Sequence, residues 1–109
     1  IDFPIVLLSA QERGVMEVAK KGFVKASREV SPATLECIAS VNVQFREYLS
    51  TQMDGMDVVL LNTKSAELLG AEVGSVITLS KEVTETEAEK LKQKISESQR
   101  EMFIRRMGG

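Results

Sequence analysis

The residue types that most often perform chemistry are nearly absent from this chain. It has 109 residues, a single cysteine and no histidine, so the commonest general base and metal ligand are missing. A reactive thiolate needs a neighbouring cation or base to lower its pKa. No Lys or Arg follows Cys37 before Arg46, and Cys37 lies on the apolar side of a predicted helix. We therefore expect a structural thiol, and we expect no catalytic residue, cofactor or metal site.

Asp54 and Asp57 flank Gly55 and Met56, and two carboxylates at this spacing could begin a calcium-binding loop. Such a loop needs further oxygen ligands and a glutamate at its twelfth position. Here the twelfth position is Ser65. Because glycine and aspartate are also typical turn residues, the sequence predicts a turn at this site.

Four cations form a short basic stripe that could contact nucleic acid or an acidic protein. Residues 1–30, 31–83 and 84–109 carry net charges of +1, −4 and +1, and none of these blocks could neutralise several phosphates. The stripe is therefore expected to be a solvated helix face, and nucleic acid is not expected as a partner. No apolar run approaches the roughly 20 residues that span a bilayer, so no membrane is expected either. The stripe consists of Lys20, Lys21, Lys25 and Arg28.

The first elements to be placed are an extended segment over residues 5–8 and a helix over about residues 10–29. Ser9 and Glu12 have the spacing of a capping box, which marks a helix start. Gly14 and Gly22 each destabilise a helix by roughly 1 kcal/mol relative to alanine. A break at either glycine, with residues 23–30 extended, is therefore the alternative. The expected apolar side of the helix comprises Val15, Val18, Ala19, Gly22, Phe23, Ala26 and Val30.

A second helix is predicted over residues 32–52. Ser31 is a favoured N-cap, and Pro32 suits the first helical position because its missing N–H has no partner there. At 100° per residue, the apolar residues fall on a single arc. They are Leu35, Cys37, Ile38, Val41, Phe45, Tyr48 and Leu49.

Residues 58–79 read as strand, short helix, turn and strand. Asn62 or Thr63 can cap the helix, Gly70 can end it, and Gly74 can supply a positive φ. The run from Leu68 to Gly74 resembles AbrB-like swapped-hairpin transcription factors, and a related phrase occurs in double-psi barrels. The resemblance implies a DNA-binding dimer with a hairpin before this unit. The sequence instead places helix 32–52 there and has one cation, Lys64, between Arg46 and Lys81.

A long C-terminal helix is predicted from the second capping box, Thr84 to Glu87, to about residue 107. Its apolar stripe is narrow and resembles a coiled-coil seam. Near its end, apolar residues crowd around much of the helix, more than one intramolecular face would use. The stripe consists of Ala88, Leu91, Ile95 and Met102, and the crowded end of Met102, Phe103, Ile104 and Met107.

These observations predict an α-rich α+β fold in one domain, residues 1–109, with residues 83–109 as a helical C-terminal extension. Three main helices would accompany a small two- or three-stranded sheet from segments near 5–8, 58–61 and 76–79. The expected function is non-enzymatic protein–protein interaction in the cytoplasm, as an adaptor, regulator or assembly component. The chain would self-associate or dock a protein partner; the alternative is a dimeric AbrB-like DNA-binding regulator. The expected partner-binding residues are Leu91, Ile95, Met102, Phe103 and Met107.

Overall fold

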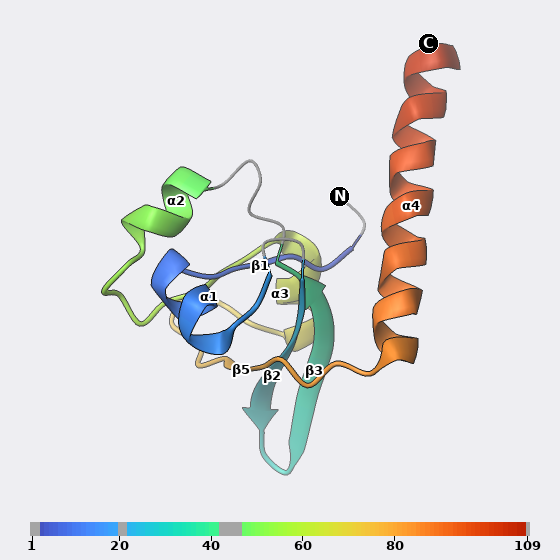
Figure 1. The fold of residues 1–109 in the computed structure, drawn as a ribbon. Coiled ribbons are helices and arrows are strands. Elements are labelled where there is room, and N and C mark those ends of the chain that lie inside the picture. Colours follow the sequence, from blue (N-terminus) through green and yellow to red (C-terminus); the bar gives the residue numbers. More distant parts are fainter. Residues whose placement is uncertain (1–2, 20–21, 42–46, 109) are drawn as a thin grey trace.

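The protein has an α+β fold with small antiparallel sheets and a long C-terminal helix, as the sequence predicts (Figure 1). The computed structural model describes residues 3–19, 22–41 and 47–108, and the side chains of residue 47 and of residues beyond Arg100 lie outside that description. The elements are β1 (Val6–Leu7), α1 (Ala10–Met16), β2 (Phe23–Val30), β3 (Ala33–Ser40), α2 (Glu47–Gln52), β4 (Leu60–Leu61), α3 (Thr63–Leu69), β5 (Thr78–Ser80) and α4 (Glu85–Gly108).

The centre of the fold is a three-stranded antiparallel sheet in the order β3-β2-β5. Ser31 and Pro32 make the turn of the β2–β3 hairpin. The helix predicted over residues 32–52 is therefore wrong for residues 33–40, and only α2 remains helical in its last part. Residues 42–46, which include Phe45 of the predicted arc, lie outside the described residues.

The hairpin replaces the predicted helices because its residues also alternate with a period of two. Val24 and Ala26 of β2 face Ala39 and Cys37 of β3 in the register, and all four side chains are buried. Pairing along eight residues satisfies the backbone of both strands. The helix predicted over residues 10–29 accordingly ends at Met16, and the extended alternative for residues 23–30 is confirmed.

The predicted strands at 5–8, 58–61 and 76–79 do not form one sheet. β1 pairs with β4 in a separate two-stranded sheet, whereas β5 joins β2. The two sheets are connected at Ser40, whose N–H donates to the carbonyl of Pro4 at 3.0 Å and which forms a parallel bridge with Ile5.

The strand–helix–turn–strand unit is confirmed in its local detail. Asn62 is the N-cap of α3, and its Oδ1 accepts from the N–H of Ser65 at 3.0 Å. Gly70 ends α3 with φ 57°, and Gly74 has φ 97°. The Asn62 side chain also holds the N-terminal segment, because Oδ1 accepts from Ile5 N–H at 2.9 Å and Nδ2 donates to the Phe3 carbonyl at 2.8 Å.

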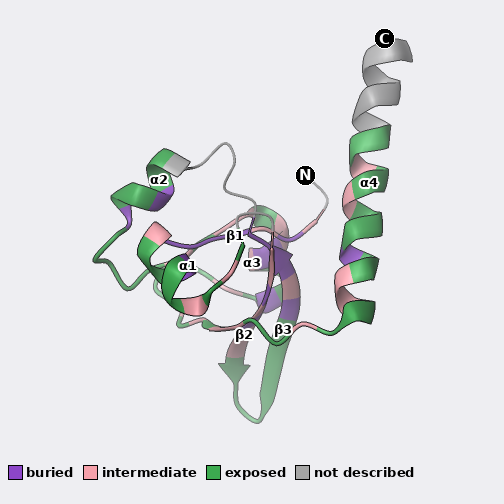
Figure 2. Ribbon diagram, viewed as in Figure 1, coloured by how far each residue is buried: buried purple, intermediate pink, exposed green. Residues whose placement is uncertain are grey.

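The hydrophobic core lies between the two sheets and α3 (Figure 2). Its larger fully buried members include Leu8, Leu69, Val6, Val24 and Val41. No helix within the described residues is long and apolar enough to cross a membrane.

Candidate functional site

α4 begins with the reciprocal capping box that the sequence predicts. The Thr84 N–H donates to Glu87 Oε2 at 3.1 Å, and the Glu87 N–H donates to Thr84 Oγ1 at 3.2 Å. Two backbone donors that would otherwise lack an intrahelical partner are thus satisfied. The box fixes the point at which the chain leaves the body and turns into α4.

The N-terminal half of α4 covers the second face of the β2–β3 hairpin. Successive side chains of a strand point to opposite faces, so Phe23 and Ile38 lie on the face opposite the core residue Val24. α4 contacts β3, and Lys92 Nζ lies 5.9 Å from the centre of the Phe23 ring. Leu91 is only 6% exposed. The Phe23 and Ile38 end of the hairpin is therefore covered by the core on one side and by a single helix on the other, whereas the turn end, residues 29–36, is exposed.

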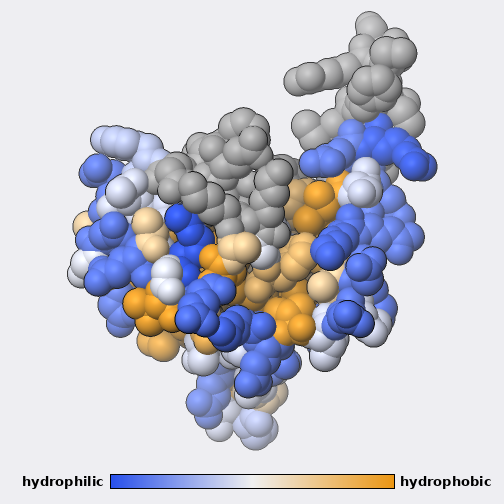
Figure 3. All heavy atoms as spheres, viewed as in Figure 1, coloured by the Kyte–Doolittle hydropathy of each residue, from blue (hydrophilic) through white to orange (hydrophobic). Residues whose placement is uncertain are grey.

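The predicted stripe of α4 is its less exposed side. Leu91 is buried and Ala88, Ile95 and Ser98 are half-buried, at spacings of three and four residues. Figure 3 shows apolar surface between the body and the near side of α4, and a hydrophilic outer side. Of the predicted partner-binding residues, Leu91 thus packs within the chain and Ile95 is half-buried. The side chains of Met102, Phe103 and Met107 lie outside the described part.

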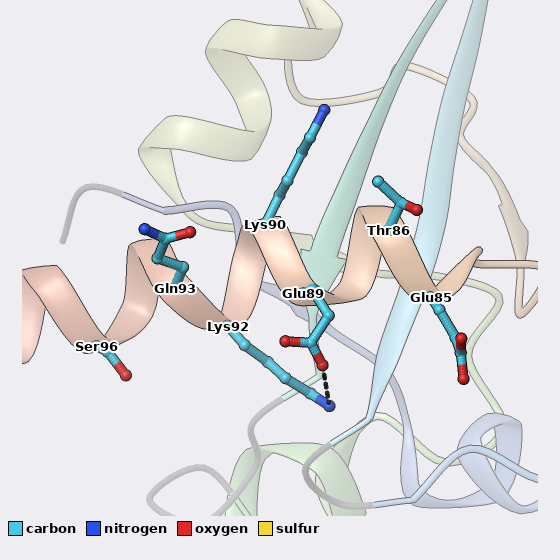
Figure 4. Close-up of a pocket in the computed structure, with 7 residues that line it drawn as sticks. All are labelled: Glu85, Thr86, Glu89, Lys90, Lys92, Gln93 and Ser96. Atoms are coloured by element: carbon cyan, nitrogen blue, oxygen red, sulfur yellow. Dashed lines mark ion pairs between the residues drawn. The ribbon is translucent and has the colours of Figure 1, made fainter.

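The outer side of this half of α4 is polar and offers no enclosed ligand site (Figure 4). At the edge between this side and the hairpin, Lys92 Nζ, which also lies over the Phe23 ring, pairs with Glu89 Oε1 at 3.7 Å. A shallow hollow on this side is lined by residues of α4 alone, so nothing closes over it: Glu85, Thr86, Glu89, Lys90, Lys92, Gln93 and Ser96.

The C-terminal half of α4 extends past the sheet (Figure 1). The helical backbone continues to Gly108. The sequence beyond Arg100 contains Met102, Phe103, Ile104 and Met107.

The predicted basic stripe is not a single face. Because residues 23–30 form a strand, Lys25 and Arg28 lie on opposite faces of the sheet. Lys25 Nζ pairs with Glu36 Oε2 at 3.5 Å. Arg28 Nη1 donates to the Gly70 carbonyl at 3.0 Å and so binds the C-terminal end of α3. No local sequence pattern predicts this role. Lys20 and Lys21 lie outside the described residues.

Cys37 is a free thiol that is 8% exposed on the core face of β3. Burial raises the pKa of this thiol from its ordinary value of 9.0. A thiol with a raised pKa is a poor nucleophile at neutral pH. Within the described residues, no three His, Cys, Asp or Glu side chains gather as a metal site would require.

Asp54 to Asp57 forms a turn, as predicted, and this turn packs on α1. The N–H of Gln11 donates to Asp54 Oδ1 at 2.8 Å, and Gln11 Oε1 accepts from the Gly55 N–H at 3.3 Å. Gly55 has φ 84°. The pairing gives Asp54 a structural role at the start of α1.

A hollow that the sequence does not predict lies between α1 and this turn. The helix predicted over residues 10–29 placed Val15 on its buried side, but Val15 is 74% exposed because α1 ends at Met16. Met56 is 60% exposed in the facing turn. No sequence pattern predicts that Val15 and Met56 lie close together, because only the tertiary fold makes their two segments adjacent. The hollow is lined by Ser9, Gln11, Glu12, Val15, Gly55, Met56 and Asp57.

No protein-family model, curated protein or solved structure matches this chain. Its assignment to a functional class therefore rests on its own geometry.

Proposed function

We propose that this chain is a non-enzymatic protein–protein interaction module, a small adaptor, regulator or assembly component of the cytoplasm. It would bind through the C-terminal part of α4, either to a second copy or to a different protein.

One observation carries this proposal: within the described residues, the side chains of α4 that pack on the body lie chiefly in its N-terminal half. In that half, Leu91 and its neighbours on the stripe pack against other residues of the same chain. The helix then continues to Gly108 past the sheet, through a segment that contains Met102, Phe103 and Met107. Methionine-rich and aromatic helix surfaces suit adaptable protein contacts.

One further feature agrees with the proposal. The free, buried thiol of Cys37 is compatible with the reducing interior of a cell, which supports a cytoplasmic location.

The test is a double change at the projecting segment, Phe103→Asp with Met107→Asp. The molar mass in solution and the proteins captured from a lysate are compared for this variant and the original chain. Gln99→Asp, which adds a charge at an exposed position of the same helix, is the control. We expect the double change to abolish association and the control to leave it intact. If neither readout depends on Phe103 and Met107, the proposal is wrong.

The alternative of an AbrB-like DNA-binding regulator gains one observation, because the β2–β3 hairpin precedes the strand–helix–strand unit. The cations of the hairpin do not favour DNA binding, since Lys25 is paired with Glu36 and Arg28 binds the end of α3. It predicts binding to duplex DNA that weakens steeply as salt is raised. Absence of binding at low salt would reject it.

A further inference from the structure

The hollow between α1 and the turn after α2 combines exposed apolar side chains with a preformed frame. Val15 and Met56 flank it from the two segments. The hydrogen bonds of Gln11 to Asp54 and Gly55 hold those segments together without filling the space, which is about 340 Å³. A preformed hollow flanked by apolar side chains is a place where an anchoring side chain of a partner can be buried.

The charge around this hollow selects the occupant. Glu12 and Asp57 line it, and Asp54 lies beside it. A hollow that is lined by two apolar and two acidic side chains favours a segment that is both apolar and basic, because opposite charges attract and like charges repel.

The C-terminal segment of α4 has this composition. Residues 100–107 contain Phe103, Met107 and further large apolar residues, and they carry Arg100, Arg105 and Arg106 against one Glu. The segment is helical along its whole length. It would therefore present an already ordered helix, which lowers the entropy lost on binding.

The segment cannot fill the hollow of its own chain. α1 lies on one side of the body and the C-terminal end of α4 on the other, as Figure 1 shows. The packing of α4 on β3 through Leu91 holds the helix in this position, away from α1. A C-terminal segment that fills the hollow must therefore come from another molecule.

Building on the proposed function, we propose that the partner is a second copy of this chain, whose C-terminal α4 segment docks between α1 and residues 55–57. Each molecule then carries one donor, the helix end, and one acceptor, the hollow. Such a head-to-tail contact forms rings where the rotation closes and open chains where it does not.

Complementation between two variants tests this arrangement. The first, Val15→Asp with Met56→Asp, changes the hollow and keeps the helix. The second, Phe103→Asp with Met107→Asp, changes the helix end and keeps the hollow. Val15 and Met56 are largely exposed, so their replacement should leave the fold intact, as circular dichroism can verify. Val73→Asp with Val76→Asp is the matched control, because both valines are exposed away from the hollow.

Light scattering after gel filtration should show the original chain and the control as oligomers and each variant alone as a single chain, with self-affinity at least about tenfold weaker. An equimolar mixture of the two variants retains one intact helix end and one intact hollow. It should give the mass of two chains and no larger species.

Three outcomes overturn the inference, and they separate it from the proposed function. If the original chain is monomeric, or if the Val15/Met56 variant associates as the original does, the hollow does not receive α4 of a second copy. A mixture of the two variants that stays monomeric has the same meaning. Loss of association in the Phe103/Met107 variant alone would still support docking through α4. If that variant also associates normally, the proposed function fails as well.

Discussion

The two faces of the β2–β3 hairpin are covered in different ways. The core face carries small side chains that are fully or nearly fully buried, among them Val24, Ala26 and Ala39, and it packs with residues from β1 and α3. The other face carries Phe23 and Ile38, which are half-buried beneath one helix.

This difference distinguishes a face that packs with several elements from a face that a single helix covers. Removal of the core face would expose buried side chains of β1 and α3 together with those of the hairpin, whereas removal of α4 would expose chiefly Leu91 and the surface beneath it. Burying one leucine side chain stabilises a protein by about 1.5–3 kcal/mol. The contact that holds α4 on the hairpin therefore contributes a free energy comparable to that of binding a partner weakly.

The largest expected effect is at the core. Leu69→Ala should lower the free energy of unfolding by about 3 kcal/mol, because Leu69 is fully buried and the change leaves a cavity. Urea denaturation measures the loss. Leu68→Ala, next in sequence and 42% exposed, is the control and should cost well under half as much. Equal costs would mean that the core is not centred on this face.

Leu91→Ala should cost less, about 2 kcal/mol, and the loss should be confined to α4. Hydrogen exchange would then accelerate along α4 while the amides of β2 and β3 keep their protection. Lys94→Ala, at an exposed position of the same helix, should change neither. Equal loss of protection in the hairpin would show that α4 and the core unfold as one unit.

At the end of α3, Gly70→Ala should cost about 1 kcal/mol, because φ 57° is unfavourable for a residue with a Cβ. The new Cβ would lie 3.5 Å from Leu35 Cδ1, an ordinary contact distance, so strain of the backbone and not a clash causes the loss. Gly14→Ala, in α1 with open space around it, should not destabilise. Thermal denaturation of both variants compares them directly.

The smallest effect should be the pH dependence contributed by Cys37. Burial raises the pKa of its thiol, so the folded state binds its proton more tightly than the unfolded chain does. The stabilisation is complete below the ordinary thiol pKa of the unfolded chain, 9.0, and is lost as the pH rises through the raised pKa of the folded state. Between pH 7.5 and pH 10 the original chain should therefore lose slightly more stability than Cys37→Ala. A steeper loss in the alanine variant would contradict the burial of the thiol.

Elements with local signals could be predicted from the sequence. Asn62, Gly70 and the Thr84–Glu87 box each act within one helical turn of themselves, and the structure confirms all three. Because such signals act locally, the sequence predicts α3 and α4.

The hairpin could not be predicted in the same way. Residues 33–40 satisfy a helical arc and a strand alternation equally, and what decides between them is the pairing with β2. The exposure of Val15 and the binding of Arg28 to the end of α3 depend on the same pairing. Long-range contacts of this kind have no local sequence signature.

The Asn62 side chain has a consequence for the order of folding. Its bonds to Ile5 and Phe3 join residues 57 and 59 positions apart in the chain, and β1 pairs with β4 across a slightly shorter separation. The β2–β3 hairpin closes with a two-residue turn, which takes on the order of 1–10 μs. Closing the longer loop costs chain entropy before its contacts form. The hairpin should thus be structured in the folding transition state, and replacement of Asn62 should mainly accelerate unfolding.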